Sequence, residues 1–169
     1  MKPLPAALAA TALALAACAQ PRPPAAVVPG AVTVQFVEPD RFTDARRSGG
    51  RGADPEVLAA LREHLERLAP GCLAPDRRLT VRITDIDLAG ETPFAVAPSE
   101  MRVLRDATWP RIELDWRLAD GAGTPLAGAT EHLIDMNYLA DFNARNDSGQ
   151  WRHDRALLTR WFRRSFCPG

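Results

Sequence analysis

Lysine is almost absent from this sequence. Lys2 is the only lysine, and arginine supplies every other basic side chain. The twenty-one basic residues are matched by twenty-one acidic ones, and the arginines are spread along the chain instead of forming a patch. Proteins that bind nucleic acid usually carry a clear basic surplus on one face. The charge balance therefore argues against nucleic acid as a partner.

Sequence motifs that indicate catalysis are also missing. There is no Gly-x-Ser-x-Gly turn for a serine nucleophile and no His-Glu-x-x-His helix for a catalytic zinc ion. The three histidines, His64, His132 and His153, show no pairing with a nucleophile that would imply a triad. We therefore predict no catalytic residue, no metal and no cofactor, and a non-enzymatic role is favoured.

The apolar segment at residues 4–17 is shorter than the roughly 20 residues that a membrane-spanning helix needs. It follows Lys2 and ends in Leu15-Ala16-Ala17-Cys18. A positive start, a short apolar core and small residues before a cleavage point are typical of an export signal peptide. The last four residues resemble the lipobox of bacterial lipoproteins, in which the cysteine is lipidated and becomes the first residue. The alternative is an ordinary secretory signal in which Cys18 has no role.

The lipobox resemblance implies a domain plan and a location. We predict that residues 1–17 are a lipoprotein signal peptide, that Cys18 is lipidated, and that residues 18–30 are a proline-rich tether. Residues 31–169 are then expected to form a single domain. Ala19 follows the cysteine in place of the aspartate that retains enteric lipoproteins at the inner membrane. The predicted location is the outer membrane, where the lipid anchor holds the domain facing the periplasm.

Cysteine is scarce, and with Cys18 set aside only Cys72 and Cys167 remain. An exported protein meets an oxidising compartment, so an even pair of cysteines favours a disulfide. The alternative is two buried free thiols. A bridge would close a loop of nearly a hundred residues, for which the chain-entropy account gives about 4–5 kcal/mol of stabilisation.

Hydrophobic periodicity predicts the order strand, helix, three strands, helix. Alternation of apolar and polar residues marks the strands, and spacing of three to four residues marks the helices. Asp54 and Pro55 indicate the start of a helix, and Pro70-Gly71 indicates its end. A switch in the apolar alternation near Asp85 indicates a β-bulge. The expected strands are 32–37, 79–88, 111–118 and 126–138, with an edge segment at 101–104, a hairpin turn at 120–123 and a loop at 139–150. The expected helices run from Pro55 to Pro70-Gly71 and from Trp151 to Phe166.

This order predicts an α+β fold. A mainly antiparallel sheet of about four strands would carry both helices on one face, which gives a two-layer sandwich. The strand at 111–118 alternates apolar with charged residues, so the other face of the sheet is expected to meet water. In the last helix, four arginines occupy the side opposite the apolar stripe: Arg152, Arg155, Arg160 and Arg163.

Several segments together resemble a family of exported bacterial proteins known as domain of unknown function 3016. The segments are Val34-x-Phe36-x-Glu38-Pro39-x-x-Phe42-x-Asp44, Thr84-Asp85-Ile86-Asp87-Leu88-Ala89-Gly90, Arg102-Val103-x-x-Asp106-x-x-x-Pro110-Arg111-Ile112, Glu131-x-Leu133-x-Asp135-x-x-Tyr138 and the helix with Trp161-Phe162. The resemblance covers nearly all of the chain after the tether and implies one compact exported domain, without an activity. Its pattern includes Phe42 and Asp44 and a candidate polar site made of Asp85, Asp87, Arg102, Asp106, Arg111 and Asp135.

Two functions fit these observations. The first is a lipid-anchored envelope protein whose domain binds or scaffolds without catalysis, with another envelope protein, a lipid or the cell wall as its partner. The alternative is a metal-dependent hydrolase in which Asp85, Asp87, Asp106 and Asp135 converge and hold a cation through their carboxylates. A structural use of the same residues would pair Arg102 or Arg111 with Asp85 or Asp106.

Overall fold

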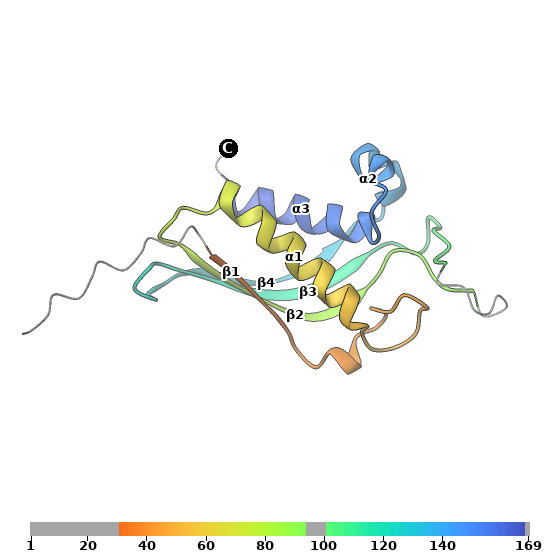
Figure 1. Cartoon of the computed structure of the whole chain (residues 1–169), viewed down its shortest axis with the longest axis horizontal. Coiled ribbons are helices and arrows are strands. Elements are labelled where there is room, and N and C mark those ends of the chain that lie inside the picture. The colour runs from red at the N-terminus through yellow and green to blue at the C-terminus, as the bar shows by residue number, and fades with distance from the viewer. Residues whose placement is uncertain (1–30, 94–100, 168–169) are drawn as a thin grey trace, which may run out of the picture.

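The structure of the protein is a computed structural model, in which residues 31–93 and 101–167 are described (Figure 1). Its sheet has four strands in the order β1-β2-β3-β4, with β1 parallel to β2 and the remaining pairs antiparallel. The strands are β1 (Ala31–Phe36), β2 (Arg78–Asp87), β3 (Arg111–Ala119) and β4 (Pro125–Ile134). The helices are α1 (Pro55–Cys72), α2 (Phe142–Asn146) and α3 (Arg152–Phe166), with 3-10 turns η1 (Pro39–Arg41) and η2 (Tyr138–Ala140).

The helices α1 and α3 lie side by side over one face of the sheet (Figure 1). Every second residue of β2 and β3 points into this layer, so the apolar alternation of the sequence becomes one core. The largest buried side chains there include Leu61, Leu65, Leu79, Ile83, Leu114, Trp161 and Phe162. The predicted two-layer α+β sandwich is confirmed.

The opposite face of the sheet is polar. Cross-strand neighbours on it pair by charge: Arg82 with Asp115 at 3.0 Å, and His132 with Glu113 at 3.3 Å. These pairs alternate along the strands with the buried apolar residues. This face therefore belongs to the water-exposed side that the charged strand pattern predicts.

Helix α1 runs further than its sequence signals indicate. Pro55 occupies the first turn as expected, but the helix continues through Pro70 to Cys72, so the predicted end at Pro70-Gly71 is wrong. A proline removes one amide donor and its ring crowds the preceding turn. Here it stands in the last turn, and the Leu73 N–H still donates to the Ala69 carbonyl at 2.9 Å, so the helix extends past it.

Sequence patterns described the second half of the chain less well. The register shift between Ile83 and Asp85 confirms the predicted bulge, but β4 ends at Ile134 instead of continuing to Tyr138. The Asp135 carboxylate accepts the Asn137 N–H and turns the chain out of the sheet. The predicted loop at 139–150 contains α2, which Asp141 caps by accepting the Ala144 N–H. The edge segment at 101–104 forms only an isolated bridge between Val103 and Glu91.

A disulfide joins Cys72 to Cys167, which confirms the predicted pairing. Cys72 ends α1 and Cys167 follows α3, so the bridge ties the two helices together at one end of the sandwich. At the other end of the sheet lie residues 37–54, 88–93, 101–110 and 135–151, which we call the loop end (Figure 1). The predicted signal peptide, Cys18 and tether lie outside the described residues. Within the described part of the chain, no helix combines the length and apolarity needed to span a membrane.

Candidate functional site

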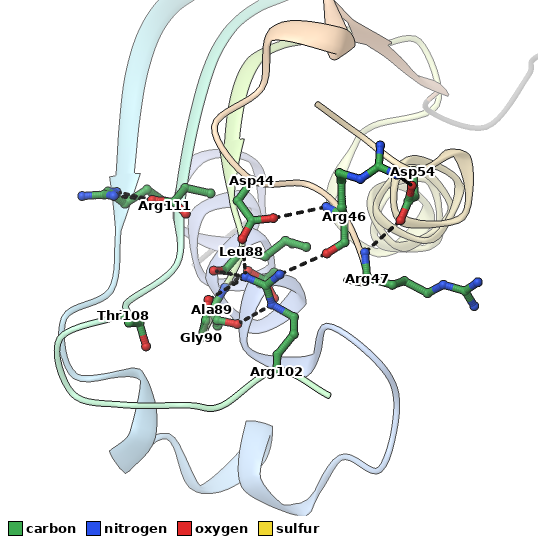
Figure 2. Close-up of polar contacts among 12 residues, drawn as sticks. Asp44, Arg46, Arg47, Asp54, Leu88, Ala89, Gly90, Arg102, Thr108 and Arg111 are labelled. Atoms are coloured by element: carbon green, nitrogen blue, oxygen red, sulfur yellow. Dashed lines mark hydrogen bonds and ion pairs between the residues drawn. The ribbon is translucent and has the colours of Figure 1, made fainter. Parts of the chain in front are cut away.

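Arg102 is the centre of the polar contacts at the loop end (Figure 2). Its side chain is only 10% exposed and makes five hydrogen bonds. Four go to backbone carbonyls: Nε to Ala89 and Nη1 to Arg46, both at 3.0 Å, and Nη2 to Leu88 at 3.0 Å and Gly90 at 2.6 Å. The fifth runs from Nη2 to the Asp44 carboxylate at 2.9 Å. One guanidinium thus holds three loops together, and we call this group the Arg102 clamp.

Asp44 reaches the clamp from a short extension of the sheet. Its N–H donates to the Ile86 carbonyl and its carbonyl accepts the Leu88 N–H, both at 2.9 Å. These bonds place Asp44 beside Asp87 in a parallel bridge, beyond the last residue of β1. The Asp44 side chain is 16% exposed, so the ion pair with Arg102 is largely removed from water. Charged hydrogen bonds are stronger in such a setting than at a solvated surface.

Asp154 lies behind the clamp, in the first turn of α3, and is 2% exposed. Its carboxylate accepts the Ala89 N–H at 3.0 Å, so it holds the same backbone segment that Arg102 holds through the carbonyls. Burial raises the pKa of Asp154 to about 6, although the Ala89 N–H and the charge of Arg102 both favour the ionised form. Sequence reasoning missed this residue, because a single aspartate in the first turn of a helix is ordinarily an exposed side chain that interacts with the helix dipole.

The raised pKa of Asp154 predicts a pH dependence. A carboxyl whose pKa is higher in the folded state binds its proton more tightly there, so its contribution to stability is complete below the unfolded pKa, 3.8, and is lost as pH rises toward 6. We therefore expect wild type to lose unfolding free energy relative to Asp154→Asn as the pH rises from 4 to 6. The shift should be on the order of 3 kcal/mol.

Urea denaturation of both proteins at several pH values measures this difference, and the effects of all other carboxylates cancel in it. The matched control is Asp115→Asn, a partly exposed aspartate on the polar face of the sheet. Its difference from wild type should not follow the Asp154 profile. A difference between wild type and Asp154→Asn that stays constant from pH 4 to 7 would contradict the prediction.

The predicted site residues on β2 and β3 lie on the polar face of the sheet, at its loop end. Asp87 pairs with Arg111, its cross-strand neighbour. Asp85 accepts both the N–H and the hydroxyl of Thr43, each at 2.7 Å. Arg102 and Arg111 therefore pair with Asp44 and Asp87, and not with Asp85 or Asp106 as the structural alternative suggested.

The remaining two predicted residues are separated from these pairs. Asp135 follows β4 and pairs with Arg160 of α3, while Asp106 is exposed in the loop before β3. The six residues thus share one end of the sheet without forming one cluster. Among residues 31–93 and 101–167, no three side chains of histidine, cysteine, aspartate or glutamate come together as metal ligands.

A second polar feature is a cleft of about 430 Å³ between α1, α2 and α3, which we call the arginine cleft. Its lining is His64, Asp141, Asn143, Ala144, Asp147, Arg152, Arg155, Ala156, Thr159, Arg160 and Arg163. The arginine face of α3 was visible in the sequence. The walls opposite it were not, because α2 was predicted as loop and no periodicity relates His64 to a helix about ninety residues later.

The observed arrangement defines a class: a small α+β sandwich closed by one disulfide, with a buried arginine that holds its loops together. Within this class, the chain belongs to the family described as Protein of unknown function (DUF3016), whose model matches residues 30–164. The match confirms the resemblance drawn from the sequence segments. No curated protein and no solved structure matches the chain.

Proposed function

We propose that this protein is a lipid-anchored envelope protein whose domain binds or scaffolds a partner in the periplasm without catalysis. The proposal is carried by the observation that charged side chains at the loop end are held in ion pairs. Arg102 with Asp44, Arg111 with Asp87, and Arg160 with Asp135 are all ion-paired. Groups held in such pairs fix the shape of a surface. Nothing in this pairing favours the metal-dependent hydrolase, which is therefore not proposed.

An exposed apolar surface beside these pairs supports a binding role. Phe142 is 74% exposed and Met136 is 70% exposed, and Ile134 and Leu139 of the same short segment are also exposed. The segment is held in place by Arg160, which pairs with both Asp135 and Asp141. Large apolar side chains displayed on a fixed backbone are typical of a surface that a partner covers. We take this partner to be another protein of the cell envelope.

The direction of β1 is consistent with this arrangement. β1 begins at Ala31, whose cross-strand neighbour Arg78 begins β2, and both strands run toward the loop end. An anchor at Cys18 would therefore attach at the end of the sheet opposite Phe142. The apolar surface would then face away from the attachment point, where a partner can reach it.

Replacing Cys18 with alanine tests the anchor. We expect the variant to move from the membrane fraction to the soluble periplasmic fraction, because no lipid can be attached without the thiol. The neighbouring substitution Ala19→Ser keeps the cysteine and should leave the protein in the membrane. Fractionation of cells that express each form measures the distribution. An unchanged membrane fraction of Cys18→Ala would show the lipoprotein assignment to be wrong.

Site-specific crosslinking tests the partner. A photoreactive residue at position 142 should crosslink one envelope protein in intact cells, which mass spectrometry can identify. The same residue at position 122, in the hairpin turn at the opposite end of the sheet, should not. Met136→Ser should weaken the crosslink from position 142, because it removes another exposed apolar side chain of the same segment. Equal crosslinking from positions 142 and 122 would reject the apolar surface as the binding site.

A further inference from the structure

We propose that two copies of this chain pair through the outer edge of β4, so that their two sheets join into one. This inference goes beyond the proposed function, because it concerns a second copy of the chain and depends neither on the anchor at Cys18 nor on a partner at Phe142. β4 is the last strand of the sheet, and within the described residues no strand lies beyond it. An open edge of this kind is a template on which a further strand can pair.

The backbone groups that β4 turns outward follow from its pairing with β3. The Asp135 N–H donates to the Pro110 carbonyl at 3.3 Å, so these residues form a hydrogen-bonded pair directly after the last pair of the two strands. Hydrogen-bonded and non-bonded pairs alternate along antiparallel strands. Every second residue of β4, beginning at Leu133, therefore bonds to β3. The residues between them direct their N–H and carbonyl groups away from the sheet: Gly128, Thr130, His132 and Ile134.

β4 carries none of the features that commonly protect a strand edge. Lysine, proline and bulges serve this purpose in natural sheets. The single lysine of the chain is Lys2, Pro125 is the first residue of β4 and the only proline in it, and the register shift with β3 lies at the start of the strand. Residues 125–130 are all exposed. The long middle of this edge is therefore open to a partner strand.

The exposed apolar side chains of β4 are placed symmetrically along the strand. Leu126 is 48% exposed and Ile134 is 51% exposed, and each lies four residues from Thr130. A two-fold axis at Thr130, perpendicular to the sheet, would pair β4 with the same strand of a second copy in the antiparallel direction. Leu126 would then lie opposite the partner's Ile134 on both sides of the axis. One contact, made twice, covers both exposed apolar side chains.

Charge and apolar pairing favour this register over its neighbours. Hydrogen bonds form only when outward-directed residues lie opposite each other, so the next registers are those centred one residue away. Centring on Glu131 would place two carboxylates directly opposite each other, which is unfavourable. Centring on Ala129 would place Leu126 opposite the partner's His132. The register centred on Thr130 has neither defect.

The resulting dimer would be a continuous sheet of eight strands. Because the axis is perpendicular to the sheet, the helices of both copies would lie on the same side of it. A single strand edge is a small interface compared with those of permanent dimers. We therefore expect reversible association, with a dissociation constant on the order of micromolar.

Cysteine crosslinking tests the register. The full chain with Cys18→Ala is used, because its two remaining cysteines are joined to each other. A residue on the axis lies opposite its own copy, so Thr130→Cys should give a covalent dimer under mild oxidation. His132→Cys is the matched control, because its side chain is exposed on the same strand but lies about 13 Å along the strand from its own copy. Non-reducing gel electrophoresis should show His132→Cys as a monomer.

Sedimentation equilibrium of the same chain tests the backbone pairing. Thr130→Pro removes an outward N–H that β3 does not use, and it should weaken the dimer about tenfold. Thr130→Val keeps this N–H and should leave the dissociation constant within about twofold. Circular dichroism of both variants shows whether the fold is retained.

A charge exchange tests the apolar contact and does not depend on proline. Leu126→Arg and Ile134→Glu should each weaken the dimer about tenfold, because each places a charge against an apolar side chain. The double variant should recover most of this loss, since the introduced arginine of one copy then lies opposite the introduced glutamate of the other.

Several results would overturn the proposal. These are a monomeric chain at concentrations of about 100 μM, equal crosslinking from Thr130→Cys and His132→Cys, no crosslink from Thr130→Cys, or a double variant no tighter than the single ones. A crosslink from Thr130→Cys to a different protein would assign the edge to another partner and would also reject self-association. None of these outcomes affects the fractionation of Cys18→Ala or the crosslinking from position 142.

Discussion

Arg102→Gln is expected to lower the free energy of unfolding by about 3–5 kcal/mol, the cost of removing one partner from a buried ion pair. The substitution leaves the Asp44 carboxylate without its counter-charge at a position that is 16% exposed. It also leaves the carbonyls of Arg46, Leu88, Ala89 and Gly90 without the donor that they share. A buried polar group that loses its hydrogen bond retains the full cost of leaving water.

Chemical denaturation followed by circular dichroism measures this loss. Arg102→Lys should recover only part of it, because an ammonium cannot reach three loops with a fork of donors. The matched control is Arg117→Gln on the polar face of the sheet, where the side chain is exposed and the expected change is within about 0.5 kcal/mol. If Arg102→Gln is as stable as the control, the clamp does not stabilise the fold. Its polar groups would then have to be considered for another role.

The Arg102 clamp also predicts where the fold loosens. Amide hydrogen exchange should accelerate in residues 44–54 and 88–91 of Arg102→Gln, because their backbone bonds depend on the clamp. Amides in the centre of β3 are paired within the sheet on both sides and exchange through global unfolding, so their exchange should accelerate only by the factor that the lower free energy of unfolding dictates. Acceleration by that same factor, and no more, in residues 44–54 and 88–91 would indicate global destabilisation in place of a local opening.

The second large effect is expected from the disulfide. Cys72→Ala/Cys167→Ala should lower the free energy of unfolding by about 2–5 kcal/mol, as is usual when a native bridge is removed from a small exported domain. The bridge joins residues that are 95 positions apart, so its loss gives the unfolded chain far more freedom. It also releases the ends of α1 and α3 from each other. Both consequences destabilise the folded state relative to the unfolded one.

Guanidinium denaturation of wild type with and without reductant, beside the double variant, measures this effect. Reductant should shift the wild-type midpoint toward that of the double variant and leave the variant unchanged. The slope of the transition should increase when the bridge is absent, because the unfolded chain then exposes more surface. Identical midpoints for oxidised wild type and the double variant would contradict the prediction.

Local patterns predicted the regular elements well and their ends less well. The alternation in residues 111–118 and the leucine spacing after Pro55 each correspond to a single strand or helix in the structure. The errors fall where a side chain of one segment acts on the backbone nearby. The turn at Asp135 shortens β4, and the cap at Asp141 begins α2. Such polar contacts follow no period, so a periodicity argument does not detect them.

Pairing between distant residues was the least predictable part of the candidate site. The family pattern drew attention to both Asp44 and Arg102, but they are 58 residues apart in sequence and nothing local relates them. Asp87 and Arg111 meet because β2 and β3 are antiparallel in one particular register. A shift by one residue would have placed them on opposite faces. Sequence arguments could thus name most of the participants without naming their partners.

The amino-acid sequence by itself predicted the four strands and the two long helices, the placement of both helices on one face of a sheet, and the pair of cysteines that could be bonded. These properties follow from short-range periodicity and from a small number of candidates. Only the tertiary structure decided that Arg102 joins three loops, that Asp154 is buried behind it, and that α1, α2 and α3 enclose a positive cleft. The reason is physical: burial, counter-charges and cleft walls are supplied by residues far apart in the chain, and folding alone brings them into contact.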